Sequence, residues 1–516
     1  MTSEQIQILI AMVIYMCAVI FIGIYFSKKA NKNSDEYFLG GRSLGPWVTA
    51  MSAEASDMSG WLLMGLPGLA FATGLADAFW TALGLAVGTY VNWLIISKRL
   101  RRYSVRANNS VTLPDFFSNR FREKKPIIMM IASLFILIFF TVYAASCFVT
   151  CGKLFSELFG LPYVAMMIVG AVFVLVYTLL GGFLAESASD FMQAIVMIIA
   201  LVVMVIVGVY AAGGFGSVIS NAKSMPGFFE LFNVPDFDNG VAKPYGFLSV
   251  VSMLAWGLGY FGMPQVLLRF MAIRKENELR RSRIIATVWV VISLAVAVFI
   301  GIVGNALSKN GTINMGNTSS ENVFIVMTTG LIPALLAGFI MAGILAATIS
   351  SSDSYLLIAA SAFAKNIFKG IFKKNATDKQ VMWSSRIVLL AIAIIAVLFA
   401  LDENSVIFKI VSFAWAGFGA TFGPLMIFSL FWKRTTREGA IAGMIAGASM
   451  VFIWKLLISK LGGGFAIYEL LPAFIFSAIV IVVVSLLTKK PSDEIVEDFE
   501  FVKNSKSLDE SQKIEE

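Results

Sequence analysis

The chain has 516 residues, of which 58% are hydrophobic and only 14% are charged, a balance far from that of soluble globular proteins. It contains no histidine, which excludes histidine-based catalytic triads, histidine-ligated metals and imidazole proton relays. The formal net charge of +8 would suit a nucleic-acid partner, but the basic residues gather in short loops between apolar runs. That placement is typical of membrane topology rather than of a nucleic-acid surface.

Long runs with almost no charge recur along the chain, and about 20 apolar residues are enough for an α-helix to cross a bilayer. The first run, residues 6–26, lacks a basic leading segment and is too long for a signal peptide, so it is predicted to be a span. The ninth run is long enough to be broken or to be preceded by an interfacial piece. In all, the pattern predicts an all-α polytopic membrane protein with about thirteen transmembrane helices, near residues 5–27, 46–71, 75–98, 126–158, 162–181, 188–212, 246–271, 284–307, 325–364, 383–401, 405–432, 438–459 and 466–488.

The basic residues predict the orientation, because loops on the cytoplasmic side carry an excess of lysine and arginine. With the N-terminus outside, the basic loops all fall on the inner side, at residues 28–42, 98–122, 274–283, 365–379 and 433–437. Every arginine is then expected at or near that face, and the C-terminus lies inside. We expect one transmembrane domain over residues 1–490, followed by a disordered, charged cytoplasmic tail at 491–516.

The second predicted span breaks the rules for a membrane helix in the stretch SAEASDMSGWLLMGLPG, which runs from Ser52 to Gly68. An ionised carboxylate at the bilayer centre costs about 2.5–3.5 kcal/mol, so Glu54 and Asp57 are expected to face a protein interior, a water-filled cavity or a cation. The small residues around them favour an unwound turn whose free carbonyls can act as hard oxygen ligands. The alternative is a helix end at the membrane interface, with Asp57 as its cap.

The seventh predicted span is interrupted in the same way, by Gly257, Gly259, Gly262 and Pro264. Its two large rings, Trp256 and Tyr260, are four residues apart, so one helical face presents both; a purely structural aromatic stripe is the alternative. The two interrupted helices lie five spans apart, which predicts two inverted repeats of five helices with a binding site at the midplane. The repeats would cover residues 46–212 and 246–432, with peripheral spans at 5–27, 438–459 and 466–488.

The ninth span carries a third polar cluster, in which Ser350, Ser351 and Ser352 precede Asp353. An isolated serine in such a helix usually bonds to the carbonyl four residues back. Four polar residues in a row are more than this local bonding explains, and their oxygen atoms suit a hard monovalent cation. Glu186 and Asp190, at the start of the sixth span, are either part of a site or simply close to the inner interface.

Four stretches carry a family resemblance: FLGGRSLGP, SAEASDMSGWLLMGLPG, AWGLGYFGMP followed by RFMA, and AGILAATISSS. In this order, over nearly the whole chain, they resemble the sodium/solute symporter family, and within it the bacterial sodium/proline symporters. The resemblance implies a LeuT-type core of two inverted repeats, sodium-coupled uptake by alternating access, a place in the bacterial cytoplasmic membrane, and Na⁺ as coupling ion with no other cofactor.

The resemblance also implies site residues. The sodium ligands would be the backbone carbonyls of Ala55, Met58 and Ala347 and the hydroxyls of Ser350 and Ser351, with Asp57 as an acid needed for sodium. The positions that match substrate-binding residues are Ser59, Gly60, Trp61, Tyr143, Trp256, Tyr260 and Pro264. Asp190 would assist sodium release, and Glu321 would lie near the outer gate. Glu54 and Asp353 depart from the family pattern, which usually has no acid at either position.

Independently of the resemblance, an aromatic box favours a small amphipathic zwitterion, by ring packing and cation–π attraction. The expected substrate is L-proline, and another amino acid or carboxylate is the alternative. A channel would need a continuous polar pore lining, and an enzyme would need a nucleophile–base pair, which the chain lacks. A sensor built on a transporter-like domain would need a partner to supply its signalling domain.

Overall fold

The computed structural model describes residues 1–30, 34–180 and 182–505. The helices are α1 (Ser3–Ala30), α2 (Ser34–Leu39), α3 (Pro46–Asp57), α4 (Leu66–Thr73), α5 (Leu75–Ile95), α6 (Ser97–Arg106), α7 (Leu113–Arg120), α8 (Ile127–Phe159), α9 (Tyr163–Leu180), α10 (Phe183–Ala211), α11 (Phe215–Lys223), α12 (Phe247–Leu254), α13 (Pro264–Ala272), α14 (Leu279–Lys309), α15 (Val323–Leu331), α16 (Ala334–Ser361), α17 (Asp378–Phe399), α18 (Ile407–Phe431), α19 (Arg437–Leu456), α20 (Leu470–Leu487) and α21 (Asp493–Asn504).

Shorter 3₁₀ or π segments join several of these helices. They are η1 (Gly40–Arg42), η2 (Trp61–Gly65), η3 (Ala255–Phe261), η4 (Glu276–Glu278), η5 (Ser320–Asn322), η6 (Ala362–Phe372), η7 (Ile458–Leu461) and η8 (Gly463–Phe465). One antiparallel hairpin, β1 (Asn233–Asp236) with β2 (Val241–Pro244), lies in a segment predicted to be outside the membrane. The sequence reading did not anticipate this hairpin.

All thirteen predicted apolar segments form helices. Within the described residues, ten helices are long and apolar enough to cross a membrane, and one bent pair, Phe247–Phe261 with Pro264–Ala272, makes an eleventh candidate. The other two predicted spans correspond to shorter apolar helices, Trp61–Thr73 and Tyr163–Leu179. The ninth predicted span is indeed preceded by a separate piece, since α15 ends at Leu331 and α16 begins at Ala334.

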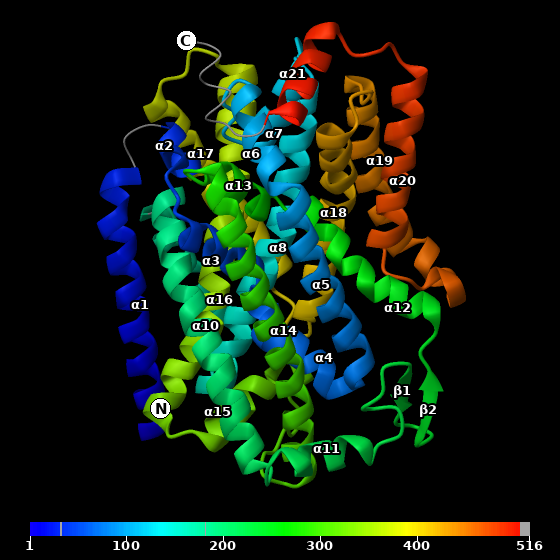
Figure 1. Ribbon diagram of the computed structural model, residues 1–516. Helices are drawn as coiled ribbons and strands as arrows, with labels where there is room; N and C mark the ends of the chain where they lie inside the picture. Colours follow the sequence, from blue (N-terminus) through cyan, green and yellow to red (C-terminus); the bar gives the residue numbers. More distant parts are fainter. Residues whose placement is uncertain (31–33, 181, 506–516) are drawn as a thin grey trace.

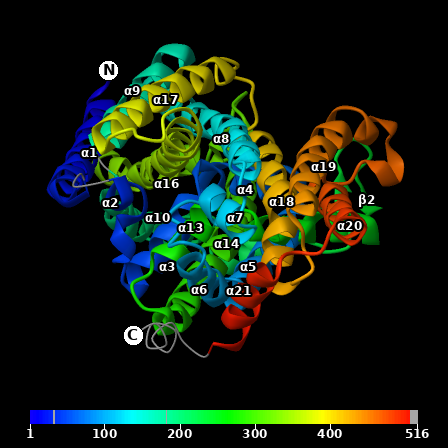
Figure 2. The same ribbon diagram turned by 90° about the horizontal axis from the view of Figure 1, so that it is seen from above.

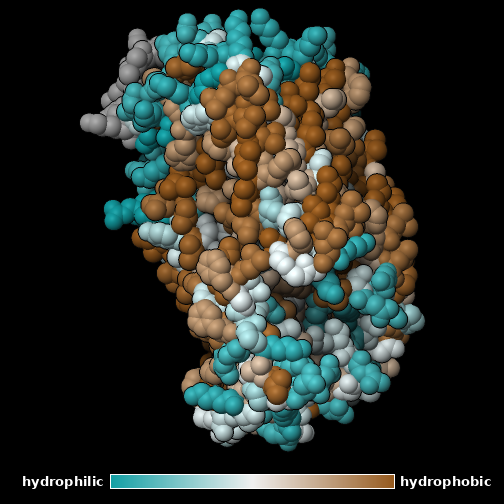
Figure 3. All heavy atoms as spheres, turned by 90° about the vertical axis from the view of Figure 1, so that its right-hand side faces the viewer, coloured by the Kyte–Doolittle hydropathy of each residue, from teal (hydrophilic) through white to brown (hydrophobic). Residues whose placement is uncertain are grey.

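The helices stand side by side in one bundle (Figure 1), and hydrophobic side chains form a broad belt between two hydrophilic ends (Figure 3). Such a belt matches the apolar thickness of a bilayer. Seen from above, α19 and α20 form a lobe beside α18, whereas α3, α13, α10, α14 and α16 lie in the main bundle (Figure 2). The first broken helix and the second half of the other, α13, lie in the main bundle, whereas α12 reaches the edge of the molecule (Figure 1).

Close helix contacts depend on small residues, as expected where lipid provides no hydrophobic drive between helices. Gly88 of α5 packs against Gly257 of η3 so closely that a Cβ on Gly88 would lie 2.4 Å from the Gly257 Cα. Glycine at these two positions thus lets α5 approach the backbone of the second broken helix.

The predicted disordered tail is wrong for residues 493–504, which form helix α21 on the face that carries the basic loops. Phe499 and Val502 are buried beneath it, and a hydrogen bond from Lys433 lowers the pKa of Glu500. The high charge of the segment masked two apolar positions three residues apart, which one face of a helix can bury together. Residues 506–516 lie outside the described residues.

Candidate functional site

The first broken helix opens at Met58. Helix α3 ends at Asp57, Met58 has φ −89° and ψ 79°, and the chain becomes helical again by η2 and α4. A Cβ on Gly60 would lie 2.4 Å from Thr150 Oγ1, so α8 packs directly on the break. Asp57 is fully buried. The predicted unwound turn is therefore confirmed, and the alternative of a cap at the membrane interface is wrong.

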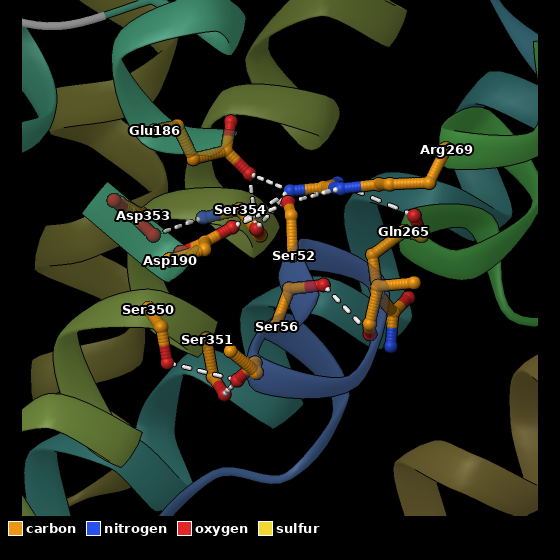
Figure 4. Close-up of polar contacts among 12 residues, drawn as sticks. Ser52, Ser56, Glu186, Asp190, Gln265, Arg269, Ser350, Ser351, Asp353 and Ser354 are labelled. Carbon is orange, nitrogen blue, oxygen red and sulfur yellow. Dashed lines mark hydrogen bonds and ion pairs between the residues drawn. The ribbon is translucent and has the colours of Figure 1, made fainter. Parts of the chain in front are cut away.

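Oxygen atoms of α3 and α16 converge beside this break (Figure 4). The Ala55 carbonyl accepts hydrogen bonds from Ser350 Oγ at 2.8 Å and from Ser351 Oγ at 3.3 Å, and Ser350 Oγ is also 3.2 Å from the Ala347 carbonyl. We call these four residues the oxygen set; Met58, the fifth predicted ligand residue, lies at the break itself. Two carbonyls and two hydroxyls, all buried, offer the hard oxygen ligands that an alkali cation accepts.

Asp57 joins the two broken helices. Its Oδ2 accepts a hydrogen bond from the Tyr260 hydroxyl at 2.9 Å and its Oδ1 accepts one from Gln265 Nε2 at 3.2 Å. Its backbone carbonyl lies 3.4 Å from both Trp61 Nε1 and the Tyr143 hydroxyl. The carboxylate therefore makes its hydrogen bonds with the second broken helix, two residues along the chain from Ala55 of the oxygen set.

The second broken helix supplies aromatic rings. Its middle is the 3₁₀ segment η3 rather than an α-helix, yet Trp256 and Tyr260 still meet a common partner, because Trp415 of α18 lies 6.2 Å from the first ring and 5.0 Å from the second, centroid to centroid. Trp61 lies 6.4 Å from Trp256. We call Trp61, Trp256, Tyr260 and Trp415 the aromatic cluster; all four side chains are buried.

The remaining predicted substrate residues lie at the same two breaks. Ser59 is buried between Asp57 and Trp61. Gly60 precedes Trp61, and Pro264 begins α13. Tyr143 of α8 stacks on Tyr355 of α16 at 4.2 Å. Trp61, Tyr143 and Tyr260 each hydrogen-bond to Asp57, so the structure brings the predicted residues from three separate segments together.

Several residues of this region were missed by the sequence reading. They are Gln265, Tyr355, Phe408, Trp415 and Tyr468. Phe408 and Tyr468 pack on Trp256 at 5.1 and 5.0 Å, and Trp415 Nε1 donates a hydrogen bond to the Trp256 carbonyl. Only Trp415 carried a usable signal, because glycines follow it at 417 and 419 and small residues mark close helix packing.

A second group of polar residues surrounds Ser52 of α3 (Figure 4). We call it the inner cluster: Ser52, Glu186, Asp190, Arg269, Asp353 and Ser354. Arg269 donates to Ser52 Oγ at 3.0 Å, to Asp190 Oδ2 at 3.2 Å, and to Glu186 and Ser354. Ser52 also donates to Asp190 Oδ2 at 2.7 Å. One fully buried guanidinium thus ties α13 to α3, α10 and α16.

The inner cluster is buried and shared between four helices. Glu186 and Asp190 are buried, and Asp353 belongs with them through its bond from the Ser354 N–H at 2.8 Å. Arg269 was not singled out from the sequence, and its side chain has no exposed surface. The sequence did contain a signal for this cluster: three acids in or beside apolar stretches, with no histidine or lysine close to them in sequence. Because buried charges are almost always paired, such acids predict a cationic partner from elsewhere in the chain.

A smaller group of polar contacts than the inner cluster lies near the predicted outer ends of the helices. Lys153 of α8 forms an ion pair with Glu321 at 2.8 Å, and the carboxylate of Glu321 also accepts bonds from the backbone N–H groups of Ile407 and Phe408, both at 3.1 Å. Glu321 therefore caps the first turn of α18, next to the ring of Phe408 that packs on Trp256.

Glu54 is fully buried, and its Oε1 accepts a hydrogen bond from Trp93 Nε1 at 3.1 Å. Its Oε2 has no partner in the described part of the chain. No basic group pairs with it there, so its contacts separate it from both the oxygen set and the inner cluster.

Comparisons with known proteins match this geometry. The family model described as the sodium:solute symporter family matches residues 37–447. The chain is 41% identical to the sodium/proline symporter of Escherichia coli K12 over 486 residues, 94% of each chain. It is also 41% identical to the high-affinity proline transporter PutP of Bacillus subtilis 168, over 92% of this chain and 97% of that protein.

Two solved structures share the fold. The chain superposes on a sodium-coupled sialic acid symporter in its substrate-bound, outward-open state with a TM-score of 0.78, at 18% identity, over 94% of this chain and 99% of that one. It superposes on MhsT in complex with L-phenylalanine with a TM-score of 0.52, at 13% identity, over 85% and 97%. The predicted LeuT-type architecture is confirmed at the level of the fold.

Proposed function

The chain belongs to the sodium:solute symporter family, and from this premise we propose that it is a secondary active transporter that carries L-proline into the cell together with Na⁺. It is a multi-pass membrane protein, and Na⁺ is its coupling ion. We further propose that it catalyses no chemical reaction. The observation that carries the choice of substrate is the 41% identity, over nearly the full length, to proteins named as sodium/proline symporters and proline transporters.

The oxygen set is the proposed sodium site. Hydrogen bonds from Ser350 and Ser351 already direct two hydroxyl oxygens to the Ala55 carbonyl, and an ion between them would replace these bonds with ion–oxygen contacts. The ion would hold α3 against α16 across the break. Each positive charge moved inward through a potential of 100 mV gains about 2.3 kcal/mol, and proline is a net-neutral zwitterion, so uptake is electrogenic.

The aromatic cluster, with Ser59, Gly60, Tyr143 and Pro264, is the proposed substrate site. A pyrrolidine ring suits packing against Trp61 and Trp256, and its ammonium suits the face of an aromatic ring. The substrate carboxylate would accept bonds from backbone N–H groups freed at the break. Asp57, which bonds to Tyr260 and Gln265, would transmit the occupancy of one site to the other.

Alternating access would use the two polar contacts on either side of this region. The inner cluster ties α3 and α13 to α10 and α16, and the contact of Lys153 with Glu321 and α18 ties the outer ends. Both are formed together here, and the site residues are buried, as in an occluded state. Release of the inner cluster would open a path inward, with Asp190 available to a departing sodium ion.

The test is uptake of labelled proline into proteoliposomes under an imposed inward sodium gradient. We expect saturable accumulation that collapses with the gradient, moves net positive charge inward, and is inhibited by proline but not by pantothenate, sialate or a sugar. Accumulation that another amino acid or a carboxylate blocks more strongly than proline would reassign the substrate. Uptake that persists in potassium alone would contradict sodium coupling.

A further inference from the structure

A basic pocket opens at the end of the molecule that carries α21. Three stretches of chain line it: the loop between α7 and α8, the start of α19, and the linker from α20 to α21. Its volume is about 650 Å³. It lies on the predicted cytoplasmic side, far from the aromatic cluster, and shares no residue with the proposed transport site.

The pocket is lined by an excess of positive charge. Six of its residues are basic, namely Arg122, Lys124, Lys125, Arg437, Lys489 and Lys490, and one, Glu438, is acidic. Four of the basic residues are lysines, and none of them forms an ion pair within the described part of the chain. A concave surface that keeps several like charges without counter-charges raises the local concentration of an anion.

The backbone adds to this field. Helix α19 begins at Arg437 inside the pocket, with Thr436 as its N-cap. The N-terminus of a helix carries a partial positive charge and favours phosphate groups. The cations and the helix end together suit the phosphate of an anionic ligand.

The surroundings indicate where that phosphate comes from. Helix α20 ends at Leu487, two residues before Lys489, and Leu486 and Leu487 are 58% and 81% exposed. On this side of the molecule the hydrophobic belt continues to the hydrophilic end (Figure 3). An anion that reached the pocket from the belt would bring acyl chains with it, and basic pockets between helices on the cytoplasmic side suit anionic headgroups.

We propose that this pocket binds the phosphate headgroup of an anionic membrane lipid, whose acyl chains lie against the exposed leucines at the end of α20. Arg122 connects the pocket to α21, because it pairs with Glu494 at 2.7 Å and with Asp498 at 2.8 Å. A bound headgroup would therefore neutralise the lysines around the linker and keep α21 docked against the inner loops.

The test is lipid binding to the purified full-length protein in detergent, with native mass spectrometry to count bound lipids. Phosphatidylglycerol is titrated against phosphatidylcholine, and glycerol phosphate serves as the headgroup without acyl chains. The pocket variant is K124Q/K125Q/K489Q/K490Q. Its matched control, K369Q/K373Q/K374Q/K379Q, removes the same four charges from another inner loop.

We expect the wild-type protein and the control to retain one phosphatidylglycerol in preference to phosphatidylcholine. Each lysine near an anionic surface contributes about fivefold in affinity, so the loss of four lysines should weaken binding to the pocket variant about six-hundredfold. Equal loss in both variants, or no preference in the wild type, would overturn the proposal. Tight binding of glycerol phosphate would assign the pocket to a soluble phosphate compound instead. If the fourfold variant fails to fold, K489Q/K490Q in the linker gives the same comparison against K373Q/K374Q.

Discussion

The two broken helices occupy corresponding positions in the predicted repeats but carry opposite chemistry. The first, residues 46–73, contains two acids and no basic residue, whereas the second, residues 247–272, contains one arginine and no acid. Each helix bonds to the other: Asp57 accepts from Tyr260 and Gln265, and Arg269 donates to Ser52. The first contributes the Ala55 carbonyl to the oxygen set, whose other members lie on α16, and the second contributes two of the four rings of the aromatic cluster and the guanidinium of Arg269.

Because of this division, neither broken helix can pair all of its own polar side chains by itself. A polar group in the apolar interior is costly unless it is paired, and here the pairs run between the two helices or from them to α10 and α16. We therefore expect changes in the first helix to act mainly on sodium and changes in the second to act mainly on substrate and on closure.

The largest effect is expected for Arg269→Gln. Removal of one partner from a buried ion pair typically costs about 3–5 kcal/mol, because the other charge stays buried, and here Glu186 and Asp190 both pair with one guanidinium. Thermal unfolding should shift down strongly, and sodium-driven uptake should be lost. Arg269→Lys keeps the charge and should recover part of the stability. If Arg269→Gln unfolds at the wild-type temperature, the inner cluster does not hold α13 in place.

Asp57→Ala should have the next largest effect. A hydrogen bond to a charged group contributes about 1.5–3 kcal/mol, so the sodium concentration for half-maximal uptake should rise about tenfold or more. Asp57→Asn, which keeps the size of the side chain, separates the charge from the packing. Sodium activation unchanged in both variants would remove Asp57 from the coupling path.

The double variant Ser350→Ala with Ser351→Ala tests the oxygen set directly. Two hydroxyl ligands at about 1 kcal/mol each should raise the sodium requirement about thirtyfold while leaving proline affinity at saturating sodium close to normal. Ser352→Ala is the matched control, because its hydroxyl bonds back to the Thr348 carbonyl of its own helix at 2.6 Å. If Ser352→Ala raises the sodium requirement more than the double variant does, the ion does not bind at the oxygen set.

Trp256→Ala, in the second broken helix, should act mainly on substrate binding. Loss of a cation–π and ring contact of about 1 kcal/mol should weaken proline binding about fivefold with a smaller effect on sodium. Trp256→Phe should lose less. Proline affinity that is intact in Trp256→Ala, measured by binding at saturating sodium, would exclude this ring from the substrate site.

The smallest effect is expected for Glu54→Gln. The amide oxygen can still accept the bond from Trp93 Nε1, whereas Glu54→Ala leaves that buried N–H unpaired at a cost of about 1–3 kcal/mol. The Gln variant should therefore unfold close to the wild-type temperature and the Ala variant below it. The opposite order would mean that the charge of Glu54 has a partner of its own.

Local rules were enough to predict both breaks and the hydroxyl-rich stretch that begins at Ser350. Glycine, proline and serine in an apolar run leave a signal wherever they stand, so the segments around Met58, Gly257 and Ser350 could be found from sequence alone. The resemblance added the role of each residue. These features depend on the chain within a few residues of the site.

The rest depends on tertiary contacts. Trp415 comes from the unbroken helix α18, and Tyr468 comes from the segment before α20. An aromatic residue in such a segment looks much the same in the sequence whether it lines a site or faces lipid. Arg269 looks like one more basic residue of an inner loop until α10 brings Glu186 and Asp190 to it. Helix α21 was missed because its ion pairs lie on partners hundreds of residues away in the sequence.

The most direct test of the account is calorimetric binding of proline to the purified protein in sodium and in potassium. Because Asp57 is two residues from Ala55 of the oxygen set and bonds to Tyr260 of the aromatic cluster, the account predicts that sodium tightens proline binding about tenfold or more, and that proline tightens sodium binding by the same factor. Proline affinity that is equal in the two salts would contradict the proposed coupling between the two broken helices.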